Sequence, residues 1–129
     1  LAAAVADYKP AEQAADKIKK KESTLSLELV KTKDILAGLG KIKQPDQTLI
    51  GFALETNNEL AYAAKKLTEK NADMIVMNSL KDKGAGFGHE TNKITLLKPG
   101  KEPVSLPLQS KAGAAGAIVD HILELRCVL

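Results

Sequence analysis

Strands and helices alternate through the middle of this sequence, and that order restricts the fold more than any other feature. Residues 48–54 and 73–77 are apolar runs of strand length, and residues 59–70 between them carry apolar side chains at helical spacing. Before them, residues 25–30 alternate as a half-buried strand does, and residues 34–41 have the pattern of another helix. Successive strand–helix–strand units place their strands parallel. We therefore predict an α/β fold, a Rossmann-like open and mostly parallel sheet with helices on both faces.

The ends of the chain add further strands and one more helix. Residues 1–5 are a continuous apolar run, which predicts a strand covered on both faces that ends before Pro10. Residues 93–97 alternate and residues 104–108 suit a short strand, which predicts an antiparallel edge, and Ser110 caps a helix to about Arg126. The side chains predicted to face the core from the three helices are Ile35, Leu36 and Leu39, then Leu60, Ala63, Ala64 and Leu67, and last Ala115, Ile118, Val119 and Ile122.

The composition is that of a single domain covering residues 1–129, and it argues against several classes of protein. The net charge of +3 and the 3% of aromatic residues do not suit a nucleic-acid-binding surface. No apolar stretch approaches the roughly 18 residues that span a bilayer, so no membrane partner is expected. The single cysteine, Cys127, gives no disulfide framework, so we expect a reducing, cytoplasmic location. Because the chain begins without Met inside an apolar run, we expect a fragment whose domain lacks its N-terminal part.

Clustered lysines are the residues that indicate a ligand most directly. Lys17 and residues 19–21 place four ammonium groups within five positions. A bound triphosphate would relieve their repulsion, although a solvated surface run has the same pattern. Lys66 and Lys70 lie four positions apart on one face of a predicted helix, which favours an anion in the same way.

Polar residues at the ends of predicted strands are further candidates, because ligands of open α/β sheets bind beyond the carboxyl ends of the strands. These residues are Asp7, Glu55 with Thr56, and Asn78. Asp7 would orient a ligand or hold a cation, or it would form a turn, and the pattern leaves both readings open.

Two other features carry no predicted function. The glycines within residues 84–88 lack the spacing and the following helix of a phosphate-binding loop, so this segment is expected to be a plain loop. His89 and His121 have no Ser, Cys or carboxylate partner at a spacing that suggests catalysis. Both histidines are therefore expected to be ordinary polar residues.

Several motifs in one order connect the chain to a known family. They are AAVADYKP at residues 3–10, KIKK at 17–20, LVKTKDIL at 29–36, GFALET at 51–56, KNADMIVMN at 70–78, GFG at 86–88 with Asn92, and Ser110-Lys111. With them the chain closely resembles the bacterial phosphopantothenoylcysteine synthetases over essentially its whole length. This enzyme is usually the C-terminal half of a bifunctional coenzyme A biosynthesis flavoprotein, whose FMN-containing decarboxylase half is absent from the sequence.

The resemblance implies a CTP-dependent ligase that acts with Mg²⁺ and forms a homodimer. CTP activates the carboxylate of 4′-phosphopantothenate as an acyl-cytidylate and releases pyrophosphate, and the amine of L-cysteine then forms the amide and releases CMP. Lys17 is the implied catalytic residue, Lys19 and Lys20 belong to a flap over the site, and Asp7 is the implied metal ligand. The implied nucleotide-binding residues are Ala3, Asp7, Lys17, Lys33, Asp34, Ile35, Leu36, Phe52, Lys66 and Lys70.

The sequence also departs from the family. Many relatives have Pro or Ala at the position of Lys33 and Ala at that of Leu54, and the family's glycine-rich first loop and an upstream Asn are absent. The fragment alone is therefore expected to be incomplete and inactive. A non-catalytic nucleotide-binding or scaffold domain of the same fold is the alternative to the ligase. A nicotinamide-dependent oxidoreductase is disfavoured because no GxGxxG precedes a helix.

Overall fold

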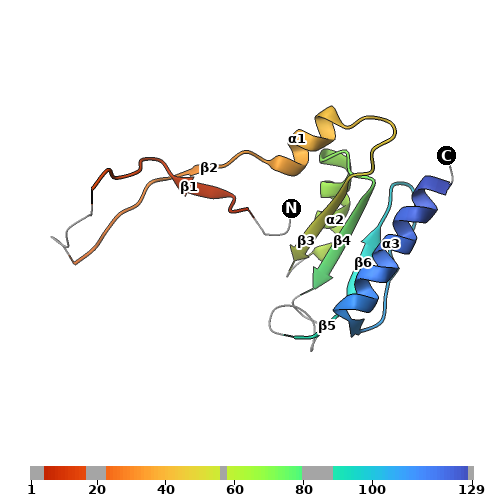
Figure 1. The fold of residues 1–129 in the computed structure, drawn as a ribbon. Helices are drawn as coiled ribbons and strands as arrows, with labels where there is room; N and C mark the ends of the chain where they lie inside the picture. The colour runs from red at the N-terminus through yellow and green to blue at the C-terminus, as the bar shows by residue number, and fades with distance from the viewer. Residues whose placement is uncertain (1–4, 17–22, 56–57, 80–88, 128–129) are drawn as a thin grey trace. The chain divides into compact units, whose positions relative to one another are not determined.

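The computed structural model describes residues 5–16, 23–55, 58–79 and 89–127, which fall into two units. The first unit, Leu1–Ile35, contains a two-stranded ribbon, and the second, Leu36–Leu129, contains a four-stranded sheet with its helices (Figure 1). Within the described residues, none of the helices has the length and apolar content needed to cross a bilayer.

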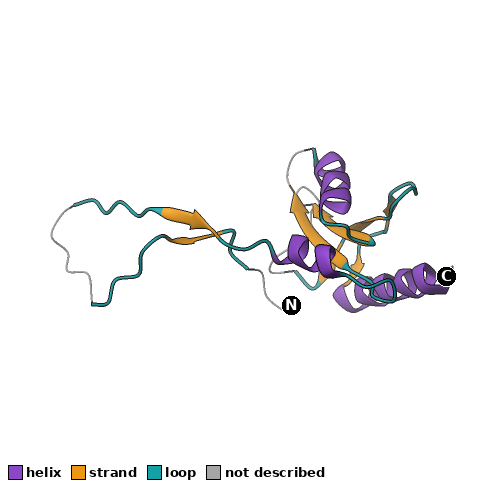
Figure 2. Ribbon diagram, turned by 90° about the horizontal axis from the view of Figure 1, so that it is seen from above, coloured by secondary structure: helices purple, strands orange, loops and turns teal. Residues whose placement is uncertain are grey.

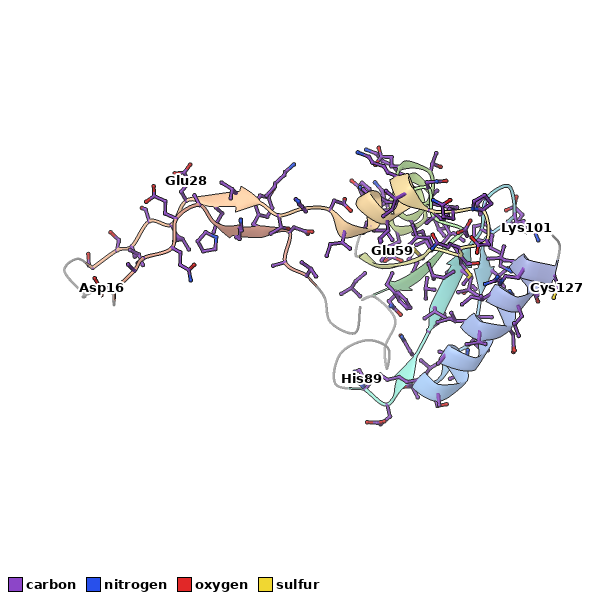
Figure 3. All side chains as sticks on the ribbon, turned by 45° about the horizontal axis from the view of Figure 1, so that its top comes forward. Asp16, Glu28, Glu59, His89, Lys101 and Cys127 are labelled. Carbon is purple, nitrogen blue, oxygen red and sulfur yellow. The ribbon has the colours of Figure 1, made fainter. Side chains whose placement is uncertain are left out.

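The described residues of the ribbon in the first unit form no core. Strand β1 (Tyr8–Pro10) pairs antiparallel with β2 (Leu29–Lys31), and the pairing continues on both sides through backbone hydrogen bonds of 2.9 Å, from Ala11 N to Glu28 O and from Thr32 N to Asp7 O. Every described side chain from residue 5 to residue 31 is exposed. Figure 3 shows these side chains projecting on both sides of the ribbon. Within the described residues, the ribbon is held by this backbone pairing and by the hydroxyl of Thr32, which donates to Ala6 O at 2.6 Å. Two isolated strands held in this way are marginally stable.

One strand prediction for this unit is wrong. Residues 25–30 were expected to form a half-buried strand, but β2 begins only at Leu29, and Leu25 and Leu27 are 73% and 58% exposed. Pro10 was expected to stop a strand, and β1 does end at Pro10, which lies opposite Leu29. A ribbon has a free edge on each strand, where a residue without an N–H group is tolerated. The strand predicted over residues 1–5 lies largely outside the described residues.

The sheet of the second unit is mixed. It has the predicted antiparallel edge, but one of the three strand pairings in its described residues is parallel, whereas a mostly parallel sheet was predicted. Strands β3 (Ile50–Glu55) and β4 (Met74–Ser79) are parallel and are joined through helix α2 (Glu59–Glu69). Strands β6 (Ile94–Leu97) and β7 (Val104–Ser105) continue the sheet antiparallel, in the order β3-β4-β6-β7. The described residues contain one parallel strand–helix–strand unit rather than the expected two, because β2 pairs with β1 and not with this sheet.

Helices cover both faces of the sheet, as predicted (Figure 2). Alternate residues of β4 point to opposite sides, so that Ile75 and Met77 pack against α2, while Met74 and Val76 pack on the side of α3 (Lys111–Cys127). The first core comprises Ala53, Ala63, Leu67, Ala72, Ile75, Met77 and Leu97, with Leu36 of α1 (Ile35–Ile42) against it. The second comprises Met74, Val76, Ile94, Leu96 and Ala114, with Ile50, Leu106, Ile118, Ile122 and Leu125 packed on it.

The helix limits were predicted closely, but the buried helix faces are narrower than predicted. In α2, Ala63 and Leu67 are buried, while Leu60 is 50% exposed. In α3, Ala114 is buried, while Val119 is 53% exposed. The other residues that were expected in the core and are exposed are Ile35, Leu39, Ala64 and Ala115. A helix that lies on a sheet touches it along one line of residues, so the margins of a wide apolar stripe stay in solvent.

Asp73 ties the amino ends of β3 and β4 together. Its Oδ1 accepts a hydrogen bond of 2.8 Å from Lys43 Nζ, and its Oδ2 accepts one of 2.7 Å from the backbone N–H of Leu49. The backbone N–H of Asp73 in turn donates to Leu49 O at 2.8 Å. One carboxylate thus fixes the start of both strands and the segment after α1.

The end of α1 packs directly against the end of α2. A Cβ atom on Gly40 would lie 1.9 Å from the carbonyl oxygen of Lys70, so only glycine fits there. Asn71, in the left-handed region at φ 49°, donates from Nδ2 to Gly40 O at 2.9 Å, and its own carbonyl accepts from Lys43 Nζ. The two helix ends are therefore joined by backbone contact as well as by side chains.

One expectation about the histidines is wrong. His121 does have a carboxylate partner, since its Nδ1 lies 2.9 Å from Oε2 of Glu124, one turn later in α3. Lys98, a buried lysine that directly follows β6, lies near both. His89 is exposed.

Candidate functional site

The parallel strands β3 and β4 end together and define the carboxyl edge of the sheet. Leu54 pairs with Asn78 and Glu55 with Ser79 at this edge. Helix α2 starts here as well, and its N-cap residue Asn58 has a left-handed backbone (φ 46°) with no side-chain cap bond. Open α/β sheets bind their ligands beyond this edge, where the first N–H groups of the helices are available.

Two amides meet at the carboxyl edge. Asn92 Nδ2 donates to Asn78 Oδ1 at 2.8 Å, and Asn92 Oδ1 accepts from the backbone N–H of Lys93 at 3.0 Å. Both side chains are half-buried. Asn92 therefore fixes the orientation of the Asn78 side-chain amide at this edge. The strand-end pattern pointed to Asn78, but nothing in the sequence predicted its bond to Asn92.

A short ladder brings the start of α3 to the same amides. Strands β5 (Thr91–Asn92) and β8 (Gln109–Ser110) pair antiparallel, with Asn92 opposite Gln109. The backbone N–H of Lys111 donates to Glu90 O at 3.1 Å. Ser110 Oγ accepts from the N–H of Gly113 at 3.0 Å, which confirms the predicted cap of this helix.

The sheet unit contains four of the residues that are predicted to bind the nucleotide, and they lie in different parts of the unit. Phe52 is 64% exposed and lies on the side of the sheet that α3 covers, where an aromatic ring is available for stacking. Lys66 lies in the last turn of α2 and Lys70 caps that helix, so the length of α2 separates them from Asn78. Leu36 packs into the first core. The structure therefore does not bring Lys66 and Lys70 to the carboxyl edge.

The ribbon unit holds the other described candidates. Asp7, Lys33, Asp34 and Ile35 are all exposed, and Asp7 contributes its backbone carbonyl to the ribbon while its carboxylate is exposed. The described residues contain no group of three metal-ligating side chains. Four further predicted residues lie outside the described part of the chain: Ala3, Lys17, Lys19 and Lys20.

The sequence matches one family model over nearly its full length. Residues 1–125 match the DNA/pantothenate metabolism flavoprotein C-terminal domain. The chain belongs to this family. The resemblance stated from the motifs is thereby confirmed at the level of the family.

Two relatives show how the family domain is used in longer proteins. The coenzyme A biosynthesis bifunctional protein CoaBC of Bacillus subtilis (strain 168) is 43% identical over 123 residues, which cover 95% of this chain and 30% of that protein. A cysteine/cysteine sulfinic acid decarboxylase from an unknown prokaryotic organism is 49% identical over 125 residues, or 97% of this chain and 35% of that protein. The chain thus spans about a third of the length of these curated relatives.

A solved structure supports the same fold. The C-terminal domain of a coenzyme A biosynthesis bifunctional protein CoaBC superposes with a TM-score of 0.69 at 40% identity, covering 93% of this chain and 50% of that one. The α/β fold predicted from the sequence is therefore confirmed, with mixed strands and three helices in the described residues.

Proposed function

We propose that this chain is part of a CTP-dependent ligase that joins 4′-phosphopantothenate and L-cysteine in coenzyme A biosynthesis. The observation that carries the proposal is membership of a family whose relatives include CoaBC proteins named for coenzyme A biosynthesis. The amides at the carboxyl edge of the sheet, where α/β folds bind ligands, are in keeping with it.

The proposed reaction has two steps, each of which needs positive charge. The carboxylate of 4′-phosphopantothenate attacks the α-phosphorus of CTP, which forms an acyl-cytidylate and expels pyrophosphate. The amine of cysteine then attacks the acyl carbon, loses a proton and expels CMP. Both partners of the first step are anions, so fixed cations at the phosphates lower its barrier. Lys17 is our candidate for this role, with Lys19 and Lys20 closing over the reacting groups.

Mg²⁺ suits the residues that the chain offers. Magnesium typically takes one or two protein carboxylates and completes its shell with water and substrate phosphates, so the exposed carboxylate of Asp7 is a suitable ligand. When bound, the ion would neutralise charge on the triphosphate.

We further propose that the ribbon unit is covered by a second copy of the chain. Its leucines Leu25, Leu27 and Leu29 are half or more exposed, and the described ribbon buries no side chain of its own. Apolar ribbons of this kind are stable when another surface covers them. Light scattering should therefore give the mass of a dimer.

A second candidate function has one specific observation in its favour. The relative that is 49% identical is named as a decarboxylase, with no ligase in its name. The same domain would then act as a non-catalytic nucleotide-binding partner of a decarboxylase.

One assay distinguishes the two candidates. Pyrophosphate release is measured on the full-length protein that contains this chain, with CTP and 4′-phosphopantothenate together, with each omitted, and with ATP in place of CTP. A ligase releases pyrophosphate only when both substrates are present, and addition of cysteine then yields CMP. Binding of CTP without turnover would instead identify the non-catalytic domain, and no binding would contradict both.

A further inference from the structure

Lys98, His121 and Glu124 form a cluster at the amino edge of the sheet, away from the amides at the carboxyl edge. Lys98 follows Leu97, which pairs with Ile75 near the start of β4. Lys98 Nζ lies 2.7 Å from His121 Nδ1 and 2.9 Å from Glu124 Oε2. His121 Nδ1 lies 2.9 Å from the same Oε2, so three polar atoms from two elements are in mutual contact.

The Nδ1 atom of His121 has two short contacts, with Lys98 Nζ and Glu124 Oε2, and it can form a hydrogen bond with only one of them at a time. A lysine ammonium has only donors, so the Nδ1 atom beside it must accept, which puts the proton of the neutral ring on Nε2. An Nδ1 atom that accepts from Lys98 cannot donate to Glu124. In the protonated ring Nδ1 carries a hydrogen, which donates to Glu124 and leaves two cations facing each other at 2.7 Å. The proton on His121 therefore selects between two arrangements.

We propose that these three residues are a proton-operated clamp between α3 and the end of β6, closed while His121 is neutral and opened when it is protonated. The clamp belongs to the fold and is independent of the proposed ligase reaction. Among the described residues, Lys98 from the β6 side and Glu124 from α3 are the charged groups that contact the ring. The other charged residues nearby in sequence, namely Lys101, Glu102, Asp120 and Arg126, are exposed.

The burial of Lys98 is the reason why protonation of His121 would cause a movement. The side chain of Lys98 is only 6% exposed, so its ammonium cannot simply turn into water when the ring becomes a cation. Either Lys98 or the ring of His121 must move, and of the two polar contacts of Lys98 with α3 only its ion pair with Glu124 at 2.9 Å then remains. Since Ile118, Ile122 and Leu125 of that helix pack on the second core, opening should loosen the C-terminal half of α3 from the sheet.

Glu124 is the other titratable group of the clamp. Its hydrogen bonds to Lys98 and then His121 hold the pKa of its carboxyl below the ordinary value of 4.5. A lowered pKa in the folded state gives stability that is present above the ordinary value and is lost as the pH falls through the lowered value. Any change that this carboxyl causes therefore occurs below pH 4.5, outside the pH range of the test.

The test follows the full chain by NMR between pH 7.5 and 5.5. Nitrogen-15 shifts of the ring give the tautomer and the midpoint of His121, and amide hydrogen exchange gives the protection of residues 120–127. We expect the proton on Nε2 at pH 7.5, and a loss of protection of about twofold to tenfold with the same midpoint, after correction for the intrinsic exchange rate. The variant His121→Gln should abolish the step, because glutamine still accepts from Lys98 but does not titrate.

His89→Gln is the matched control, since it removes the other histidine, which is exposed, and should leave the step unchanged. A ring with its proton on Nδ1 at pH 7.5, or protection that does not change through the titration of His121, would overturn the clamp. So would a step that persists in His121→Gln. The wild-type titration decides the question even where a variant fails to fold.

Discussion

The ribbon and the sheet unit differ in what holds them and in what they carry. The sheet unit has two apolar cores and a dense set of hydrogen bonds at its amino edge. The ribbon has three paired residues on each strand and no buried side chain among its described residues. Yet most of the residues that we propose to bind the nucleotide fall in the ribbon unit, including Asp7, Lys17, Lys33 and Asp34.

This contrast separates the residues that specify the fold from those proposed to act on the substrate. Substitutions in the sheet unit should change stability, because each removes packing or leaves a polar atom unsatisfied. Substitutions of exposed ribbon residues should change activity and leave the unfolding midpoint almost unchanged. Four variants, taken from the largest expected effect to the smallest, test this separation.

Gly40→Ala should have the largest effect. The new Cβ would lie 1.9 Å from Lys70 O, and a backbone atom cannot move aside as a side chain does. We expect a loss of about 3 kcal/mol or more in the free energy of unfolding, measured by circular dichroism in denaturant. The control is Gly38→Ala in the same helix, where no atom lies within 4 Å and alanine should stabilise by about 0.5–1 kcal/mol. Equal effects of the two variants would contradict the close contact.

Lys17→Gln in the full-length enzyme should lower turnover in the pyrophosphate assay by at least ~10²-fold. That factor corresponds to about 2.7 kcal/mol of lost transition-state stabilisation, the usual result of removing one fixed charge at a developing anion. Lys65→Gln, on an exposed lysine paired with Glu69 at 3.7 Å, should leave turnover unchanged. Near-normal turnover of Lys17→Gln would remove this lysine from its proposed role.

Asp73→Ala should destabilise the sheet unit by about 2 kcal/mol. The substitution removes the carboxylate that accepts hydrogen bonds from the Lys43 ammonium and from the N–H of Leu49. The side chain of Lys43 is only 14% exposed, so water replaces this acceptor poorly. Thermal unfolding followed by circular dichroism measures the change. The control is Asp46→Ala, in the exposed turn before β3, whose free energy of unfolding should stay within about 0.5 kcal/mol of the wild type. A loss in Asp46→Ala as large as that in Asp73→Ala would mean that the hydrogen bonds of Asp73 do not stabilise the sheet unit.

Asp7→Asn should have the smallest effect, a weakening of CTP use by about tenfold, or about 1.4 kcal/mol. The ribbon should be unaffected, because the backbone carbonyl of Asp7 makes the pairing bond and the substitution keeps it. The Michaelis constant for CTP measures the effect, with Glu12→Gln on the same ribbon as the control. A fall in the unfolding midpoint would show instead that the carboxylate forms a turn.

The periodicity of apolar residues predicted the elements whose apolar side chains pack on the sheet. The helix expected over residues 59–70 is Glu59–Glu69, and the one expected to end at Arg126 is Lys111–Cys127, because their apolar spacing reflects contact with the sheet. The prediction of a strand over residues 25–30 was wrong because an alternation of apolar and polar residues shows only that one face of the segment is apolar. It does not show whether the same chain covers that face, and here no described residue does.

Contacts between distant residues were beyond prediction for a similar reason. The bond of Asn92 to Asn78 depends on a ladder of two residues, β5 with β8, which has no sequence signal of its own. The approach of Glu124 to His121 was visible as a spacing of three on a helix. Lys98 joins them from 23 residues earlier, and only the fold brings it there.

The single parallel connection also bears on how the chain folds. Ile50 pairs with Met74, so β3, α2 and β4 form a continuous segment that buries Ala53, Ala63 and Ile75 within 30 residues of chain. Closing so short a loop costs little conformational entropy, and the burial of apolar side chains in the same segment offsets this cost. The ribbon closes a loop of similar length, Pro10 to Leu29, without that burial.

We therefore expect the transition state for folding to contain the β3–α2–β4 segment and to exclude the ribbon. Truncation of Ile75 to valine should slow folding, whereas truncation of Val30 in the ribbon should leave the folding rate almost unchanged. Stopped-flow folding rates of the two variants measure this order. A sheet that forms first would allow the ribbon to be remodelled in evolution without a kinetic penalty for the rest of the chain.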